Sequence, residues 1–407
     1  MKLTKISLAA LVALGAFSSV ASATPLEEAI KNVDLSGMAR YRYTHVHDYD
    51  KKQKNVSKSN DAGHNFKMIT NFKAAIDDNF FGVIGLRYNA TDGSGDNAGT
   101  GTDKTDTTTG FGVHQFYLGY KIGGTTITAG KQEIGSYFTD DAIGTGVRVV
   151  NEDIEGLTLT ALAFDALEGD DTESDGKLYE KTNLLKDYDV GNLYAAGIAG
   201  SFNPVSFQLW YGTLTNLADV LAADVSAKFD ITDDFGLGAR LNYANSIADK
   251  EAKNNPKLGY TDGNFYAGEL STSLFGLDLA AGYIGWKAQD KGVSAFTFED
   301  QGGLITAGED VFDWTYAEGK GNFFYATSAY TFDKFTVGLD YVKGNIKTAV
   351  ANNKDVKDKV EEFVPRFAYQ YNKKLTFSSF YSFQTHKKPN DVKEKEDKFR
   401  FEAKYSF

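Results

Sequence analysis

The sequence predicts an all-β protein, an 18-stranded antiparallel transmembrane β-barrel with short periplasmic turns, long extracellular loops and an inward-folded third loop. Three observations predict this fold: an export signal at the start, segments that alternate apolar and polar residues, and connections that alternate between short and long. The 30 Phe, 23 Tyr and 41 Gly against 5 Pro are typical of strands and turns. A mean hydropathy of −0.35 fits a barrel, because only every second residue of its strands meets lipid.

The first 23 residues have the form of a signal peptide. Lys2 and Lys5 precede an apolar stretch over 6–17, and Ala21-Ser22-Ala23 supplies a cleavage pattern of small residues. The apolar stretch is shorter than the ~20 residues of a spanning helix. We therefore expect a mature chain of residues 24–407 that forms one domain. It opens on Thr-Pro-Leu-Glu, a capping box that predicts a short helix over 24–32.

The strands follow from a two-residue period. In the first of them Leu35 and Tyr41 fall on one face, and Arg40 and Arg42 fall on the other. The predicted strands are 33–44, 64–76, 80–90, 111–120, 125–131, 146–151, 157–165, 192–202, 205–214, 221–230, 235–245, 264–274, 277–287, 321–332, 335–346, 361–371, 375–386 and 397–407. The last strand ends on Phe407, which is typical of barrels that the outer-membrane assembly machinery recognises.

Long polar connections alternate with turns of two or three residues. The predicted loops are 45–63, 91–110, 132–145, 166–191, 215–220, 246–263, 288–320, 347–361 and 387–396. This asymmetry is typical of outer-membrane barrels, and an even number of strands puts both chain ends on the periplasmic side. A soluble β-sandwich rarely needs 18 strands, and a β-helix would show a short repeat that this sequence lacks.

Charge and composition exclude several functions. Removal of residues 1–23 takes away two lysines and changes the formal net charge from −12 to −14. A chain this acidic is a poor nucleic-acid binder, and without cysteine it has no disulfide or thiolate metal site. No serine or histidine stands in a catalytic context, so we expect neither an enzyme nor a required cofactor.

All seven arginines occupy strand positions that the alternation turns toward the lumen. They are Arg40, Arg42, Arg87, Arg148, Arg240, Arg366 and Arg400. Arg87 and Arg400 stand about seven residues from the periplasmic end, which corresponds to a height of about 16 Å in a tilted strand. The arginines therefore predict a basic belt near the middle of the membrane. Arginine could be confined to the lumen side of the strands simply because only that side meets water. This explains why the seven side chains point to the lumen but not why they share a common depth.

The third loop, 132–145, has the composition of a loop that folds into the barrel. Ile134, Tyr137 and Phe138 could pack against the wall, and Asp140 with Asp141 could face the basic belt. We expect this arrangement to produce a transverse field at a constriction.

Carboxylates from three separate loops suggest a calcium site. Asp141, one residue of the pair Asp170 and Asp171, and Glu309 would supply the hard oxygen ligands that Ca²⁺ prefers. Loop acids that merely keep the surface soluble are the alternative.

Several motifs resemble the Campylobacter-type major outer-membrane porin family. They are ATPLEEAI at 23–30, SG at 36–37, RYRY at 40–43, AGKQ at 129–132, GTG at 144–146, VVN at 149–151, EDQG at 299–302, AGE at 307–309, FS at 377–378 and YS at 381–382. The resemblance implies an 18-stranded homotrimeric general-diffusion porin with cation preference and an inward third loop. It also implies acidic loop ligands for Ca²⁺ at Asp141, the 170–171 pair and Glu309.

We therefore expect a multi-pass protein of a Gram-negative outer membrane that passes ions and small hydrophilic solutes through a water-filled pore. Weak cation selectivity is expected because acidic residues outnumber the arginines. The expected partners are further copies of the chain, outer-membrane lipid with lipopolysaccharide, and the barrel-assembly machinery. A substrate-specific channel and a surface adhesin or structural barrel are the alternatives.

Overall fold

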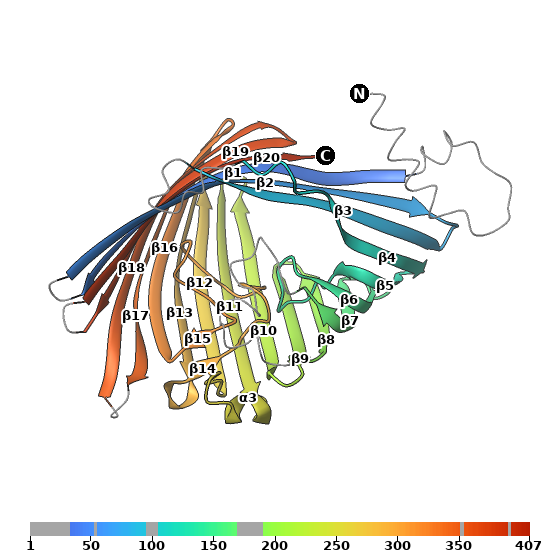
Figure 1. Cartoon of the computed structure of the whole chain (residues 1–407). Helices are drawn as coiled ribbons and strands as arrows, with labels where there is room; N and C mark the ends of the chain where they lie inside the picture. The colour runs from blue at the N-terminus through green and yellow to red at the C-terminus, as the bar shows by residue number, and fades with distance from the viewer. Residues whose placement is uncertain (1–32, 53–54, 95–104, 169–189, 351–353, 390–391) are drawn as a thin grey trace.

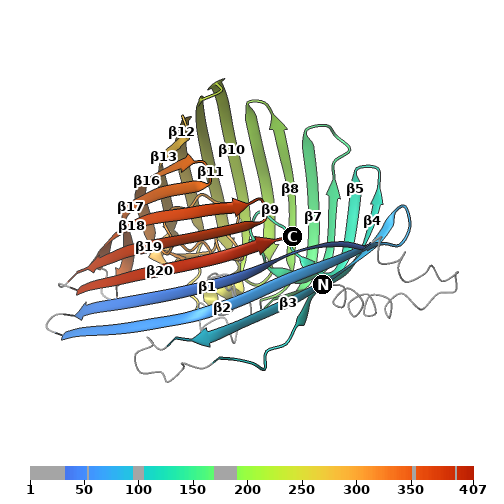
Figure 2. The same ribbon diagram turned by 90° about the horizontal axis from the view of Figure 1, so that it is seen from above.

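A computed structural model describes the chain except for residues 1–32, 53–54, 95–104, 169–189, 351–353 and 390–391 (Figure 1). Eighteen strands form one sheet in which each strand is antiparallel to its neighbours, and the last strand pairs with the first (Figures 1 and 2). The predicted fold class is thus confirmed. The predicted signal peptide, the helix over 24–32 and Asp171 lie outside the described residues.

The element bounds follow the predicted strands closely in the membrane-spanning part. The barrel strands are β1 (Val33–Lys52), β2 (Asn55–Ala75), β3 (Phe80–Gly93), β4 (Gly112–Ile122), β5 (Thr125–Glu133), β6 (Ile143–Asn151), β7 (Leu157–Leu167), β8 (Leu193–Phe202), β9 (Val205–Leu214), β10 (Ala218–Thr232), β11 (Phe235–Ala248), β12 (Gly263–Leu274), β13 (Leu277–Ala288), β16 (Lys320–Phe332), β17 (Phe335–Val350), β18 (Lys354–Asn372), β19 (Leu375–Lys388) and β20 (Val392–Ser406). The shorter elements are α3 (Lys250–Asn254), η1 (Gln289–Lys291), β14 (Val293–Ser294) and β15 (Ala317–Glu318).

The barrel closes where β1 meets β20. The amide N of Gly37 donates to the carbonyl O of Phe407 over 2.9 Å, and the amide N of Phe407 donates to the carbonyl O of Gly37 over 3.0 Å. Closure satisfies backbone groups that would otherwise face hydrocarbon at a free edge. The outward face is apolar, with Leu270 at 70 % and Phe324 at 68 % exposure. No helix of the described residues is long and apolar enough to cross a membrane.

Three predicted loops are largely strand, so those predictions were wrong. β1 and β2 cover most of 45–63, β17 and β18 most of 347–361, and β19 and β20 most of 387–396. β10 likewise begins inside the predicted loop 215–220. Beyond the hydrocarbon layer both faces of a strand meet polar surroundings, so the alternation disappears while backbone pairing continues. Figure 2 shows the β1–β2 and β19–β20 hairpins projecting together on one side.

The interior holds two loops, of which the sequence predicted one. The third loop, 134–142, runs between β5 and β6, and the segment 289–319 runs between β13 and β16. The second was predicted as a polar external loop, which was wrong: Phe296 and Trp314 are fully buried and Phe312 nearly so. Burial of these aromatic side chains inside the barrel holds the segment there.

Candidate functional site: a loop-lined constriction

The two inward loops pack against each other as one unit. Phe138 is fully buried, and its ring centroid lies 5.4 Å from that of Phe298. The carbonyl O of Phe138 accepts from the amide N of Phe298 over 2.7 Å and from the amide N of Glu299 over 3.1 Å. The carbonyl O of Tyr137 accepts from the amide N of Gly303 over 2.8 Å. The inward third loop therefore has a second loop as its support.

Tyr137 fastens this unit to the wall at β10. Its hydroxyl donates to Asp224 Oδ2 over 3.2 Å. Burial raises the pKa of the Tyr137 hydroxyl, and the Asp224 carboxylate raises it further, so the hydroxyl stays protonated and can donate. Asp224 also accepts from Arg240 Nε and Nη2 over 3.1 and 2.6 Å. Arg240 Nη2 in turn donates to the carbonyl O of Gly303 over 2.7 Å, so one carboxylate and one guanidinium hold both loops.

Segment 305–310 is fastened along the wall from β11 to β20. The amide N of Ile305 donates to Asn242 Oδ1 over 2.7 Å. The fully buried Glu362 carboxylate accepts from the amide N of Glu309 over 3.1 Å and from that of Asp310 over 3.4 Å. Asp310 Oδ1 then pairs with Lys398 Nζ over 2.6 Å. This part of the segment therefore crosses the inner face of several strands at the level of the arginines.

Gly308 allows segment 305–310 to run close along the inner wall of the barrel. Its φ is +78°, and a Cβ there would overlap Glu362 Oε2. A side chain would therefore both strain the backbone and displace the carboxylate that holds the segment.

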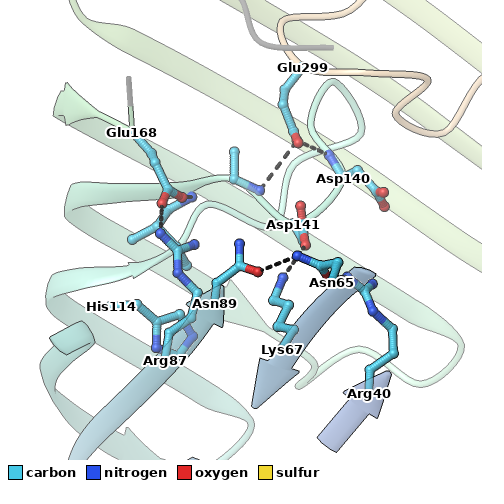
Figure 3. A network of polar contacts seen from close by, with 12 residues as sticks. Arg40, Asn65, Lys67, Arg87, Asn89, His114, Asp140, Asp141, Glu168 and Glu299 are labelled. Atoms are coloured by element: carbon cyan, nitrogen blue, oxygen red, sulfur yellow. Dashed lines mark hydrogen bonds and ion pairs between the residues drawn. The ribbon is translucent and has the colours of Figure 1, made fainter. Parts of the chain in front are cut away.

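A basic wall faces an acidic loop tip in the space that remains (Figure 3). Arg40 and Lys67 are directly opposite each other on β1 and β2, and Arg87 follows on β3. Across from them, Lys67 Nζ lies 3.8 Å from Asp141 Oδ2. The Lys67 side chain is 2 % exposed, whereas that of Asp141 is 45 % exposed, so the carboxylate is the more accessible member of the pair.

Glu299 holds the acidic tip in place. Its Oε2 accepts hydrogen bonds from the amide N of Asp140 and, over 3.3 Å, from that of Ala142 (Figure 3). The tip at 140–142 is thus positioned by the second inward loop, and this leaves the Asp140 and Asp141 side chains exposed.

The seven arginines all stand at inward positions, but most have partners other than Asp140 and Asp141. Arg42 Nη2 pairs with Glu402 Oε2 over 2.8 Å, and Arg87 Nη2 pairs with Glu168 Oε1 over 2.5 Å. Arg366 binds both Asp340, over 2.6 Å, and Glu309. Arg40 donates to Asn65, and Arg240 pairs with Asp224. Arg148 lies against Gly135, and Arg400 lies over the Phe380 ring. The belt is thus largely a row of ion pairs.

The sequence contained a signal for these partners. Asp224, Asp340 and Glu402 occupy the inward positions of their strands, as the arginines do. Ser226 is the residue directly opposite Arg240, and Asp224 lies two residues from Ser226 on the same strand. Glu402 lies directly opposite Arg42. The alternation within each strand could have identified these acids as inward-facing. Only the strand register shows which arginine each acid lies beside.

A cavity of about 910 Å³ lies against the part of the inner wall that carries four of these arginines. Arg42, Arg240, Arg366 and Arg400 line it together with small and hydroxyl side chains of β10–β19. Phe380 also lines it, and the guanidinium carbons of Arg366 and Arg400 lie 5.6 and 5.3 Å from its ring centroid. These are cation–π distances, so both guanidinium groups are held at the cavity wall.

The described residues contain no group of three or more histidine, aspartate or glutamate side chains placed to hold a metal. Of the three predicted calcium ligands, Asp141 faces Lys67 and Glu309 faces Arg366, and Asp171 is outside the described part. The calcium site therefore stays a prediction.

A closed 18-stranded barrel whose interior is narrowed by loops and lined with charge has the architecture of outer-membrane channels. The chain belongs to the Campylobacter major outer membrane protein family, whose model matches residues 1–407. This places it in the outer membrane and points to a channel rather than an enzyme. No curated protein sequence matches the chain.

Solved structures share the fold at low sequence identity. Pseudomonas aeruginosa OpdQ is 14 % identical, with a TM-score of 0.66 over 92 % of this chain and 98 % of that chain. P. aeruginosa OccK9 (OpdG) is 16 % identical, with a TM-score of 0.67 over 92 % and 99 %. A BenF-like porin from Pseudomonas fluorescens Pf-5 is 16 % identical, with a TM-score of 0.68 over 92 % and 99 %.

Proposed function

We propose that the protein is a general-diffusion porin with weak cation selectivity. Ions and small hydrophilic solutes would pass the constriction between the basic wall and the acidic loop tip. The observation that carries this proposal is the pairing of the arginines: a guanidinium that is already bonded to a carboxylate contributes little net field to a passing ion.

Acidic side chains outnumber basic ones along the constriction and the arginine belt. The basic side chains of the constriction and belt are Arg40, Arg42, Lys67, Arg87, Arg148, Arg240, Arg366, Lys398 and Arg400. The acidic ones are Asp140, Asp141, Glu168, Asp224, Glu269, Glu299, Glu309, Asp310, Asp340, Glu362 and Glu402. Because the acids outnumber the bases, the lumen should attract cations modestly.

Planar-bilayer recording in a KCl gradient tests this proposal. The expected result is stepwise conductance with a reversal potential on the cation side. No conductance would contradict the pore, and a reversal potential on the anion side would contradict the charge argument.

A substrate-specific channel is the second candidate. The Arg400 guanidinium over the Phe380 ring favours it, because a planar carboxylate or aromatic solute could bind there. Concentration-dependent, saturable block of the ion current by such a solute would support this candidate. Current that stays independent of solute concentration would leave general diffusion.

A homotrimer is part of the same proposal, on the basis of family membership. Mild chemical cross-linking of the protein in native membranes should yield a three-chain species that dissociates on heating. A ladder without a preferred three-chain species would contradict it.

A further inference from the structure

The outward face of the barrel carries a dense band of lysines at the extracellular ends of consecutive strands. These strands are β13, β16–β20, β1 and β2, which lie side by side (Figure 2). The lysines of this lysine band are Lys51, Lys58, Lys287, Lys320, Lys343, Lys347, Lys357, Lys359, Lys387, Lys393 and Lys395. They have the same parity as the exposed, lipid-facing Phe324, Tyr341, Phe363 and Phe383, so they point away from the lumen.

The register aligns many of these lysines directly across strands. Lys387 on β19 is opposite Lys359 on β18 and Lys393 on β20, and Lys393 is opposite Lys51 on β1. Directly opposite side chains in an antiparallel pair have Cβ atoms about 4.5–5.5 Å apart, and like charges there repel. Four adjacent strands thus present a row of positive charges.

A second row runs along the neighbouring strands. Lys320 is opposite both Lys287 and Lys347, and Lys347 is opposite Lys357. Repulsion in two such rows would destabilise the sheet ends unless anions lie against them.

The described part of these strands supplies few such anions. On the same outward strand positions the described carboxylates are Glu361 and Asp397. Glu361 Oε1 is engaged by Lys343 Nζ over 3.4 Å and by the Tyr341 hydroxyl. Among the described strand residues, the lysines of the band therefore far outnumber the carboxylates on the same face.

The height of the band matches the outer surface of the membrane. Lys287, Lys320, Lys347, Lys359 and Lys387 stand 10 to 13 residues from the periplasmic ends of their strands. At roughly 2.3 Å per residue they lie roughly 23–30 Å up, beside the upper limit of an apolar band about 25 Å tall.

Aromatic pairs lie on the same face below the lysines. The ring centroids of Tyr283 and Phe324 are 5.0 Å apart, and those of Phe363 and Phe383 are 6.3 Å apart. Such a girdle marks the boundary between hydrocarbon and headgroups. The lysines therefore face the headgroup layer rather than bulk water alone.

The opposite side of the barrel lacks this feature. Strands β6–β12 contain a single lysine, Lys228, close to the periplasmic end of β10. A general need for solubility would have spread lysines around the whole rim. Their concentration on one side indicates a specific anionic neighbour there.

We propose that the lysine band is a docking surface for a phosphorylated glycolipid of the outer leaflet, the chemistry that lipopolysaccharide presents next to the membrane. Phosphate groups would lie between opposed lysines and relieve their repulsion, while acyl chains would lie on the aromatic and aliphatic surface below. Lysine suits this role because its compact ammonium binds a phosphate as a point charge.

Titration of the detergent-solubilised full-length protein with fluorescent diphosphoryl lipid A tests the proposal. The test variant combines Lys359→Gln, Lys387→Gln and Lys393→Gln, and a matched control combines Lys121→Gln, Lys257→Gln and Lys373→Gln. The test variant should bind at least about tenfold more weakly, since each lysine near an anionic headgroup contributes appreciably. The control should bind as the wild type does, and wild-type protein should bind lipid A without phosphates at least about tenfold more weakly.

Channel conductance and a heat-modifiable gel mobility show that the variants have folded, and Lys387→Gln alone serves if the triple variant does not. Equal affinity of test variant and wild type would overturn the proposal, as would an equal loss in the control. Displacement of lipid A by millimolar inorganic phosphate would instead identify a free-anion site. Equally tight binding of a soluble sulfated polysaccharide would make the band a surface for acidic polymers.

Discussion

The field at the constriction can be changed most directly at the acidic loop tip. Asp140 and Asp141 are exposed at the tip, and Asp141 faces the buried Lys67 at 3.8 Å. The double substitution Asp140→Asn and Asp141→Asn removes two negative charges and keeps the side-chain size. It also spares Glu299, which holds the tip through the amide N of Asp140 and that of Ala142. The loop should therefore keep its course while the field weakens.

The magnitude follows from Coulomb's law. One charge about 8 Å from a hydrated ion contributes about 0.5 kcal/mol in water, and salt at about 0.1 M reduces this by roughly half. Because a carboxylate attracts a cation and repels an anion, each substitution should lower the cation-to-anion permeability ratio roughly twofold. The pair together should lower it roughly fourfold, enough to abolish or invert a weak cation preference.

The measurement is the reversal potential in a KCl gradient across a planar bilayer. Asp233→Asn, in the exposed turn between β10 and β11, removes one charge away from the constriction and serves as the control. The single-channel conductance should stay close to that of the wild type. A reversal potential that the double substitution leaves unchanged, or moves toward cations, would refute the assignment of the field to this loop tip.

Four further predictions concern the inward loops, the ion pairs of Arg366, the seam between β1 and β20, and calcium. Phe138→Ala removes the fully buried ring between the inward loops; it should cost about 3–5 kcal/mol of stability and increase conductance, and an unchanged conductance would mean that these loops do not narrow the pore. Arg366→Ala leaves its two carboxylates without their base, so the reversal potential should move toward cations, opposite in sign to the double substitution above. Deletion of Phe407 removes two backbone bonds at the seam between β1 and β20 and should reduce the heat-modifiable species in purified outer membranes; normal yield would show that the terminal residue is dispensable. If Ca²⁺ binds through Asp141 and Glu309, chelator should lower the unfolding temperature and added Ca²⁺ should restore it, whereas identical melting curves would dismiss the site.

The inward side chains were predictable because parity is a local property. Arg240 and Arg366 alternate with lipid-facing neighbours, so their direction follows from their own strands. Their partners were not predictable in the same way. Glu309 reaches Arg366 from a loop 57 residues away in sequence, and no spacing rule connects the two.

The second inward loop was missed although its composition carried the same signal as the first. Phe296, Phe298 and Trp314 lie in a segment that also contains several glycines and acidic residues, and these made it resemble an external loop. The reasoning that placed Tyr137 and Phe138 inside the barrel applies equally to these residues.

The sequence by itself determined the barrel, its strand number and the facing of its charges, because alternation in lipid is enforced at every second residue of every strand. Only the tertiary structure decided which charges neutralise one another, where the loops narrow the lumen and how the lysines align across strands. Those properties depend on register and on contacts between distant segments. A register shift by one residue would reverse every facing, and a shift by two would preserve the facing yet change every partner.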